Sequence, residues 1–287
     1  MTETDPEAEI GRLDALCEKA ATLCGGGRMV WRIFGDSDRT LALFHGGSGS
    51  WWHWIRCIEP LRARGFKLLI PDLPGLGDSD NAPQPYDAAV FGAILADGIR
   101  RLTSPGNPPH LAGFSFGGVT GGHAAAALGH RARSMTIIGS GGMGLTRPPM
   151  AKLMRWRRLP TEEERKAAHQ HNLMTLMLAH ESTLDDLALY IQYHNTVRAR
   201  TKSGPASRRA TLQKVLPKAT CKLAGIYGEL DATAKGYLDE RRAFFAEMQP
   251  GAPFDVISGS GHWVMYEGYE AFLTVLVRNL DRFDAIA

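Results

Sequence analysis

The sequence G-F-S-F-G at residues 113–117 constrains the fold of this chain more than any other segment does. It closes the apolar run 110–114, which has the length and composition of a buried strand, and a segment typical of a helix start, G-V-T, follows it. A serine hydroxyl attacks a substrate only if it projects from the backbone, and small flanking residues permit the strained turn that makes it project. The segment therefore predicts a strand, a sharp turn and a helix, with Ser115 at the turn as the candidate nucleophile.

Short apolar runs recur along the whole chain and alternate with amphipathic stretches. They predict seven β-strands, at residues 29–34, 41–44, 66–70, 110–114, 134–138, 222–227 and 254–257. Strands that alternate with helices form a mostly parallel sheet covered on both faces, with the functional loops at the carboxyl ends of the strands. With 287 residues, 44% of them hydrophobic, the chain can bury the core of one such α/β unit and carry an insertion.

Two carboxylates and a histidine follow the last two predicted strands. Asp231 and Glu229 lie in the loop after the strand at 222–227, and Asp231 is the acid candidate with Glu229 as its competitor. His262 lies in the glycine-rich loop after the strand at 254–257, from which a side chain is free to reach inward. A nucleophile, an acid and a base thus occur in that order along the chain, each at the carboxyl end of a predicted strand.

Together these motifs resemble the α/β-hydrolase superfamily over nearly the whole chain. The resemblance rests on the segment at 113–117, on His45-Gly46-Gly47, on the proline- and glycine-rich turn at 71–79, on Gly228-Glu229-Leu230-Asp231 and on Gly261-His262-Trp263. It implies an α/β-hydrolase fold and a triad in which Ser115 attacks, His262 takes its proton and Asp231 orients His262. It also implies an oxyanion hole made by the backbone N–H groups of Gly47 and Phe116.

One segment interrupts the alternation of strands and helices. Residues 143–214 contain no strand-like run, whereas 162–178 and 184–197 have helical patterning, so we expect a helical cap at 143–214 inserted into a core of 1–142 and 215–287. The cap has thirteen Lys or Arg residues against six Asp or Glu residues, although the net charge of the whole chain is only +3. A basic lid over a serine site favours anionic substrates, while the solvated outer faces of the cap helices account for most of these charges.

Five residues are candidates for substrate contact. Arg198 and Arg200 follow the second cap helix, where the chain turns back toward the core and a guanidinium group could bind a substrate carboxylate through two hydrogen bonds. Ser48 lies in the glycine-rich loop, Phe114 directly precedes the candidate nucleophile, and Trp263 directly follows the candidate base. Tryptophans after the glycine-rich loop and methionines in the cap indicate that the pocket is otherwise apolar.

Within the superfamily the chain most resembles the meta-cleavage-product hydrolases, which cleave a C–C bond in vinylogous 1,5-diketo acids from aromatic degradation. The loop at 45–50, the motif Gly261-His262-Trp263 and the length of the cap carry this resemblance, which implies an apolar substrate with a carboxylate. That family usually has Asn where Phe114 stands, and its cap arginine has no unambiguous counterpart, so hydrolysis of small carboxylic esters remains an alternative. A non-catalytic receptor on the same fold, which binds a small ligand without converting it, is the alternative from another class.

Several classes of cofactor and partner are not indicated by the sequence. The ten histidines lack spacings such as H-E-x-x-H and a triad hydrolase uses no cation, so we expect no metal and no other cofactor. A net charge of +3 without a base-stacking motif does not indicate nucleic-acid binding. No stretch approaches the roughly 18 apolar residues of a membrane helix, and the acidic residues 1–9 lack a signal pattern, so we expect no membrane association and a cytoplasmic location. The four scattered cysteines are expected to be reduced, and the sequence does not decide between a monomer and a homo-oligomer.

Overall fold

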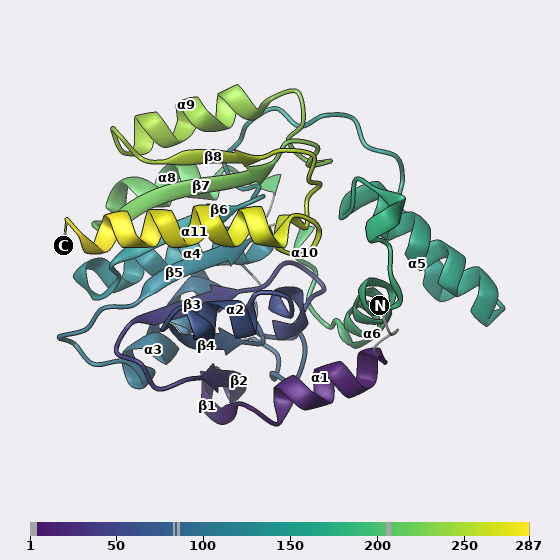
Figure 1. Cartoon of the computed structure of the whole chain (residues 1–287), viewed down its shortest axis with the longest axis horizontal. Coiled ribbons are helices and arrows are strands. Elements are labelled where there is room, and N and C mark those ends of the chain that lie inside the picture. Colours follow the sequence, from purple (N-terminus) through teal and green to yellow (C-terminus); the bar gives the residue numbers. More distant parts are fainter. Residues whose placement is uncertain (1–4, 83, 85–86, 205–207, 287) are drawn as a thin grey trace.

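A sheet of eight strands lies at the centre of the molecule (Figure 1). The computed structural model describes residues 5–82, 84, 87–204 and 208–286 of the chain. The strands are β1 (Glu18–Cys24), β2 (Gly27–Phe34), β3 (Thr40–Phe44), β4 (Lys67–Pro71), β5 (His110–Phe114), β6 (Ser134–Ile138), β7 (Lys222–Gly228) and β8 (Phe254–Ile257). Their order is β1-β2-β4-β3-β5-β6-β7-β8. β2 runs antiparallel to both of its neighbours, and every pairing from β4 across to β8 is parallel, which confirms the mostly parallel sheet.

The strand β1 is the one that the sequence analysis missed. It lies at the edge of the sheet and pairs only with β2, and of its seven residues only Thr22 and Cys24 are buried. An edge strand with one face toward solvent needs few apolar residues, so the sequence E-K-A-A-T-L-C has no apolar run that would reveal it. The other seven strands lie within two residues of their predicted bounds.

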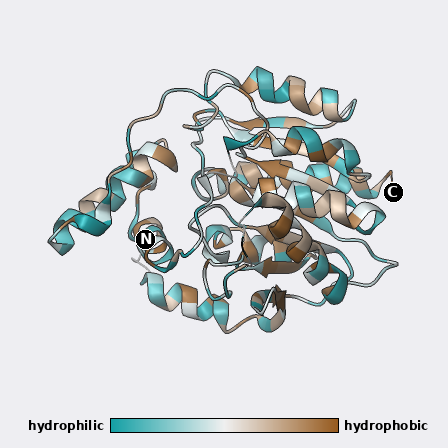
Figure 2. Cartoon of the chain, turned by 180° about the vertical axis from the view of Figure 1, so that it is seen from behind, coloured by the Kyte–Doolittle hydropathy of each residue, from teal (hydrophilic) through white to brown (hydrophobic). Residues whose placement is uncertain are grey.

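Two groups of helices cover the two faces of the sheet. The helices are α1 (Pro6–Asp14), α2 (Ile58–Ala63), α3 (Ala88–Leu102), α4 (Phe116–Leu128), α5 (Glu162–Leu176), α6 (Asp186–Arg198), α8 (Thr211–Val215), α9 (Leu238–Met248), α10 (Val264–Glu267) and α11 (Tyr269–Asp284). Ala42 and Phe44 of β3 pack on one face with side chains of α3, α4 and α9, while Leu41 and Leu43 pack on the other with side chains of α1, α2 and α11. Figure 2 shows the apolar strands enclosed between helices that are hydrophilic on their outer sides. None of the helices in the described ranges has the length and apolar character needed to cross a bilayer.

The helices α5 and α6 stand apart from the helices that cover the sheet. They lie between β6 and β7 in the sequence and beside the carboxyl ends of the parallel strands in space (Figure 1). The short helix α8, by contrast, packs on α4 so closely that a Cβ atom at Gly122 would lie 2.4 Å from Leu212. We therefore propose that the cap consists of the segment with α5 and α6, and that α8 belongs to the core although it was predicted within the cap range 143–214.

A buried histidine at the start of β5 links the stability of the core to pH. His110 donates from Nε2 to Asp284 at 3.0 Å and accepts at Nδ1 from the Ser134 hydroxyl at 2.8 Å. Burial lowers the pKa of His110 from its ordinary 6.5 to about 4, despite the attraction of Asp284. Between pH 6.5 and pH 4 the unfolded chain binds a proton at His110 more readily than the folded protein does. The contribution of His110 to the free energy of unfolding is therefore fully present above pH 6.5 and is lost as the pH falls toward 4.

We expect this histidine to account for about 2 kcal/mol of the unfolding free energy that the protein loses between pH 7 and pH 5. Urea unfolding of wild type and His110→Gln at both pH values measures it. Between pH 7 and pH 5 the unfolding free energy of His110→Gln should fall by about 2 kcal/mol less than that of wild type. Equal losses in the two proteins would show that His110 is not protonated differently in the folded and unfolded states.

Candidate active site

The segment G-F-S-F-G at residues 113–117 forms the predicted strand, turn and helix. β5 ends at Phe114, α4 begins at Phe116, and Ser115 between them has φ +51° and ψ −113°. A positive φ is unfavourable for a residue with a Cβ atom, so neighbouring contacts must maintain it. Ser115 donates its N–H to the Ile138 carbonyl at 2.8 Å, and its own carbonyl accepts from the Ser140 hydroxyl at 2.7 Å. These bonds to the end of β6 hold the serine in the strained turn.

The two glycines of the motif are required by the close approach of other backbone segments. A Cβ atom at Gly113 would lie 2.3 Å from the carbonyl oxygen of Gly117, and one at Gly117 would lie 2.3 Å from the carbonyl oxygen of Phe44. Backbone atoms at these positions cannot move aside without disturbing the sheet. The spacing G-x-S-x-G is therefore a packing requirement of the turn.

Ser115, His262 and Asp231 come together although they are far apart in the sequence. The Ser115 hydroxyl donates to Nε2 of His262 at 3.1 Å, and Nδ1 of His262 lies 2.9 Å from both carboxylate oxygens of Asp231. Asp231 is fully buried, and one of its oxygens also accepts the backbone N–H and the hydroxyl of Thr233, both at 2.8 Å. The arrangement can withdraw the serine proton through His262 and stabilise the resulting imidazolium with a fixed carboxylate.

Glu229, the competitor for the acid position, faces away from His262. Its carboxylate accepts the Ser258 hydroxyl and the Gly259 N–H, both at 2.8 Å. These hydrogen bonds, that from Gly259 first, lower the pKa of Glu229. The structure thus brings Asp231, and not Glu229, to the histidine.

The loop after β3 has a peptide orientation suited to binding an oxyanion. His45 donates from Nδ1 to the Gly46 carbonyl at 2.8 Å, and its Nε2 accepts the Leu73 N–H at 2.8 Å, which fixes the ring between them. Because the C=O and the N–H of one peptide point in opposite directions, the Gly47 N–H points away from His45. Phe116 is the first residue of α4, so its N–H has no acceptor within the helix. Both predicted oxyanion donors are thus oriented by the backbone.

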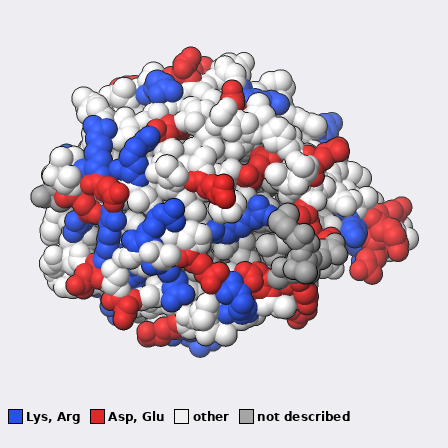
Figure 3. Space-filling model, in the orientation of Figure 1, with Lys and Arg blue, Asp and Glu red and all other residues white. Residues whose placement is uncertain are grey.

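A cavity of about 740 Å³ opens onto Ser115 and His262. Its apolar lining comes mostly from the cap, with Leu176 and Met177 at the end of α5 and Met150, Leu153, Met154 and Trp156 before it. Five basic side chains also line it, namely Arg147, Arg157, Arg200, Lys202 and Arg208, and none of the described lining residues is acidic. The acids of α5 lie elsewhere, since Glu162, Glu163 and Glu164 form its first turn and Figure 3 shows acidic side chains gathered at the outer tip of this helix.

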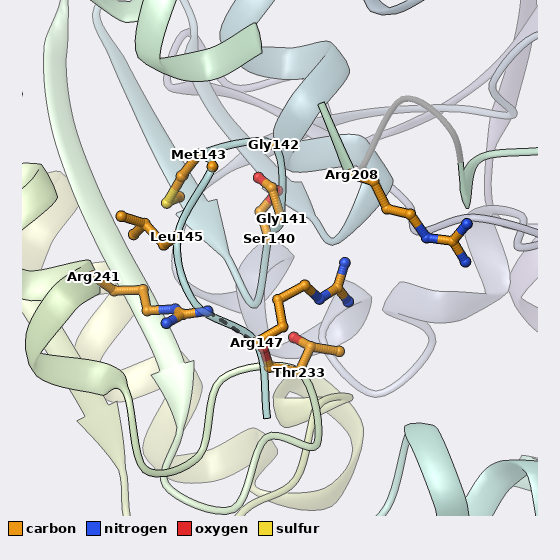
Figure 4. Close-up of a pocket in the computed structure, with 10 residues that line it drawn as sticks. Ser140, Gly141, Gly142, Met143, Leu145, Arg147, Arg208, Thr233 and Arg241 are labelled. Atoms are coloured by element: carbon orange, nitrogen blue, oxygen red, sulfur yellow. Dashed lines mark hydrogen bonds between the residues drawn. The ribbon is translucent and has the colours of Figure 1, made fainter. Parts of the chain in front are cut away.

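A smaller pocket of about 70 Å³ shares lining residues with this cavity, among them Thr233, whose hydroxyl donates to Asp231. Arg147, Arg208 and Thr233 line both spaces, and Arg241 lines the smaller one (Figure 4). Arg241 is held by the backbone carbonyls of Tyr237 and Thr233, at 3.0 and 3.4 Å. Arg147 and Arg208 form no ion pair or hydrogen bond within the described part of the chain. Partial desolvation and the nearby Arg208 and Arg241 lower the pKa of Arg147, although Asp231 opposes this effect.

The two arginines predicted to bind substrate have other partners. Arg198 forms an ion pair with Asp78, lies 5.9 Å from the centre of the Trp52 ring and does not line the cavity, so the prediction for it is not supported. Arg200 does line the cavity, but its side chain donates to Asn81 and to the Ser79 carbonyl. Both residues therefore anchor the end of the cap to the loop after β4.

Of the other predicted substrate contacts, only Ser48 lines the cavity. Phe114 is buried, with its ring centre 4.9 Å from that of His262, and Trp263 is buried against Tyr266 and donates its indole N–H to the His53 carbonyl at 2.9 Å. Neither aromatic ring lines the cavity, so these two predictions require correction. Phe114 thus packs against His262, and Trp263 packs against His53 and Tyr266.

Arg147 and His53 line the cavity and carry polar groups that can bind a ligand, but the sequence analysis did not predict them as site residues. Arg147 lies in the loop after β6, and His53 lies in a short 3-10 helix (Trp51–Trp54) after the glycine-rich loop. The surplus of basic residues in the cap was the only sequence signal for Arg147, and it did not distinguish this arginine from the others. No sequence pattern marked His53, which is 5% exposed and surrounded by aromatic rings.

The cap histidines do not form a metal site. His169 packs between Trp156 and Tyr193, whereas His171 bonds to the Lys152 carbonyl. In the described ranges no three His, Cys, Asp or Glu side chains are grouped as metal ligands would be.

Comparisons with known proteins agree with this fold. The family model described as "Alpha/beta hydrolase family" matches residues 41–275. A 2-hydroxy-6-oxo-6-phenylhexa-2,4-dienoate hydrolase of Burkholderia cepacia is 25% identical over 252 residues, 83% of this chain and 86% of the relative. A 2-hydroxy-6-oxononadienedioate/2-hydroxy-6-oxononatrienedioate hydrolase of Escherichia coli (strain K12) is 26% identical over an alignment of 297 residues, gaps included, which covers 96% of this chain and 97% of the relative. The crystal structure of a membrane phospholipase A from a bacterium has a TM-score of 0.76 at 19% identity, over 97% of this chain and 92% of that one, and shows a shared fold.

Proposed function

Because this chain belongs to the Alpha/beta hydrolase family and is a hydrolase, we propose that it uses Ser115, His262 and Asp231 to cleave a carbon–carbon bond in a vinylogous diketo acid. The geometry of the three side chains supports a nucleophilic mechanism, since the hydrogen bonds run from the serine hydroxyl through the histidine to the carboxylate. The names of the relatives support the dienoate class of substrate.

The proposed reaction proceeds in two stages. Ser115 Oγ attacks the substrate ketone carbon while His262 takes the hydroxyl proton, and the N–H groups of Gly47 and Phe116 stabilise the oxyanion. In the diketo form of the substrate the carbon–carbon bond then breaks, and its electron pair is delocalised through the neighbouring C=C bond onto the keto oxygen next to the acid group. His262 returns the proton to this enolate oxygen, which gives a 2-hydroxydienoate as the first product. Water, deprotonated by His262, hydrolyses the acyl ester of Ser115 and releases the second product and the free enzyme.

The charge of the cavity is the observation that carries the substrate class. Five basic and no acidic side chains line the space that reaches Ser115, among the residues that the structure describes. Assembling like charges around a partly desolvated space is unfavourable unless an anion enters it, and such a cavity concentrates anionic ligands. The apolar cap residues beside these cations fit a substrate with a hydrocarbon portion and a carboxylate.

Two substrates distinguish this reaction from ester hydrolysis. Wild type and Ser115→Ala are mixed separately with a 2-hydroxy-6-oxo-dienoate and with a short p-nitrophenyl ester, and absorbance is followed. We expect rapid loss of the dienoate and slow release of p-nitrophenolate by wild type, with neither reaction in the variant. Rapid ester cleavage with a stable dienoate would instead make the protein an esterase.

Replacing Arg147 with Gln is expected to raise KM for the dienoate by roughly tenfold to a hundredfold, because a charge-assisted hydrogen bond contributes about 1.5–3 kcal/mol. Arg147 is suited to this role because it has no ion-pair partner in the described chain and lines both spaces beside Asp231. Steady-state kinetics with the dienoate and with a neutral p-nitrophenyl ester measure the effect. For the neutral ester we expect kcat/KM to stay within about threefold of wild type.

Arg155→Gln serves as the matched control, since Arg155 is exposed and does not line the cavity. It removes the same charge from the cap and should leave KM for the dienoate unchanged. An equal rise in KM for both variants would indicate a long-range effect of net charge. A wild-type KM in Arg147→Gln would exclude this arginine from substrate binding.

A further inference from the structure

His53 is a buried histidine of the cavity that the proposed reaction does not use. It lies in the short helix Trp51–Trp54, is 5% exposed, and lines the same cavity as Gly47, Ser115 and His262. Its ring centre lies 5.7 Å from that of Phe114, the residue before the nucleophile. The histidine therefore lies on the side of the site where the oxyanion is expected to form.

One hydrogen bond determines which ring nitrogen of His53 carries the proton. Nδ1 of His53 lies 3.2 Å from the backbone nitrogen of Gly46, and a backbone N–H can only donate, so Nδ1 is the acceptor. The neutral ring must then carry its proton on Nε2. Burial, together with the nearby His45 and His262, lowers the pKa of His53 well below its ordinary value and keeps the ring neutral.

The protonated nitrogen faces the cavity. Gly49 packs against the Nδ1–Cε1 edge of the ring, where a Cβ atom would lie 2.3 Å from Cε1 and 2.6 Å from Nδ1 of His53, while the side chain lines the cavity and Nε2 is not among the fully buried polar atoms without a partner. Within the described part of the chain the Nε2–H group has no hydrogen-bond partner. A buried donor that lines a cavity and has no protein partner is available to a ligand in that cavity.

We propose that the Nε2–H of His53 is a third donor of the oxyanion hole, beside the backbone N–H groups of Gly47 and Phe116. This inference rests on the proposed acyl transfer at Ser115. The hydrogen bond from Gly46 to His53 couples the ring to the His45–Gly46 peptide, which adjoins the peptide that carries the Gly47 N–H, and so restrains the position of the ring relative to the backbone donor. A neutral imidazole suits this role because a second cation would oppose formation of the His262 imidazolium.

Two substitutions separate this donor from a purely structural role of the ring. The amide of Asn reaches about as far as Nδ1 of His, and the amide of Gln reaches about as far as Nε2. His53→Asn can therefore keep the bond from Gly46 but loses the donor, whereas His53→Gln keeps a donor toward the cavity. We expect kcat of His53→Asn to fall by roughly a hundredfold to a thousandfold at nearly constant KM, and kcat of His53→Gln to stay within about tenfold of wild type.

Labelling of Ser115 by a p-nitrophenyl phosphonate compares wild type with the two variants without a known substrate. The phosphonyl oxygen occupies the oxyanion position, so the labelling rate depends on the donors of the oxyanion hole. We expect wild type to be labelled fastest, His53→Gln more slowly and His53→Asn most slowly. A wild-type rate in His53→Asn, or a slower rate in His53→Gln than in His53→Asn, would overturn the proposal. If wild type is labelled but converts neither substrate, the proposed function fails while the labelling rates still test His53.

A measurement on wild type covers the case in which a variant does not fold. The proton on Nε2 of His53 is followed by NMR of the ¹⁵N-histidine-labelled protein before and after phosphonylation of Ser115. We expect a downfield shift, because the proton enters a charge-assisted hydrogen bond. An unchanged resonance, or a protein in which Ser115 is not labelled at all, would contradict the proposed donor.

Discussion

Replacing Ser115 with Ala is expected to lower kcat by roughly a millionfold, for the dienoate and for the ester alike. The Ser115 hydroxyl is the group that donates to Nε2 of His262, so the variant lacks the side-chain nucleophile that His262 and Asp231 would activate. The remaining rate should come from binding and from the oxyanion hole alone. Steady-state kinetics at high enzyme concentration, with labelling by the phosphonate as a second readout, measure the loss.

Ser115→Gly distinguishes chemistry from folding at the same position. Glycine accepts φ +51° without strain, so this variant should be as inactive as Ser115→Ala but more stable than wild type by about 1 kcal/mol. Urea unfolding measures the difference in the free energy of unfolding. Substantial turnover in either variant would show that another residue is the nucleophile and would remove the basis of the proposed mechanism.

Replacing Asp231 with Asn is expected to lower kcat by roughly ten-thousandfold with little change in fold. One carboxylate oxygen accepts two hydrogen bonds from Thr233, so the amide oxygen of Asn should take that position. The amide NH₂ then faces Nδ1 of His262 and donates to it, which leaves the histidine proton on Nε2, where the serine proton must go. Kinetics from pH 5 to pH 9, with circular dichroism as a check on folding, test this expectation.

Glu229→Gln is the matched control for the acid position. It makes the same change two residues away, on a side chain that bonds to Ser258 and Gly259 and not to His262. We expect its kcat to stay within about twofold of wild type. The reverse result, a large loss in Glu229→Gln and a small one in Asp231→Asn, would assign the acid to Glu229.

Most of the sheet could be predicted because buried parallel strands are continuous apolar runs. Every residue of β3, β5 and β6 is buried, since helices cover both faces, and such runs are visible in a sequence. β1 has only two buried residues, and its position is decided by pairing with β2. The helix α8 lies within a range with no strand, and our proposal that it belongs with the core rests on its packing against α4.

The proposed reacting residues could be singled out in the sequence because the patterns around each of them are local. Each lies just after a strand, and the glycines around Ser115 are needed wherever backbone segments approach as closely as they do here. The substrate contacts could not be predicted in this way. Arg198 and Arg200 looked suitable from their place after a helix, but Asp78 and the loop after β4 bind them.

The sequence by itself thus determined the succession of seven of the eight strands along the chain and the strained turn that presents Ser115, since periodicity and small residues act over a few positions. Only the tertiary structure decided which carboxylate meets His262, which arginine lacks a partner, and where the proton of His53 points. These properties depend on distances between segments up to 147 residues apart in the chain, as for Ser115 and His262. Electrostatic and hydrogen-bond energies follow such distances and the accompanying burial, which no local pattern encodes.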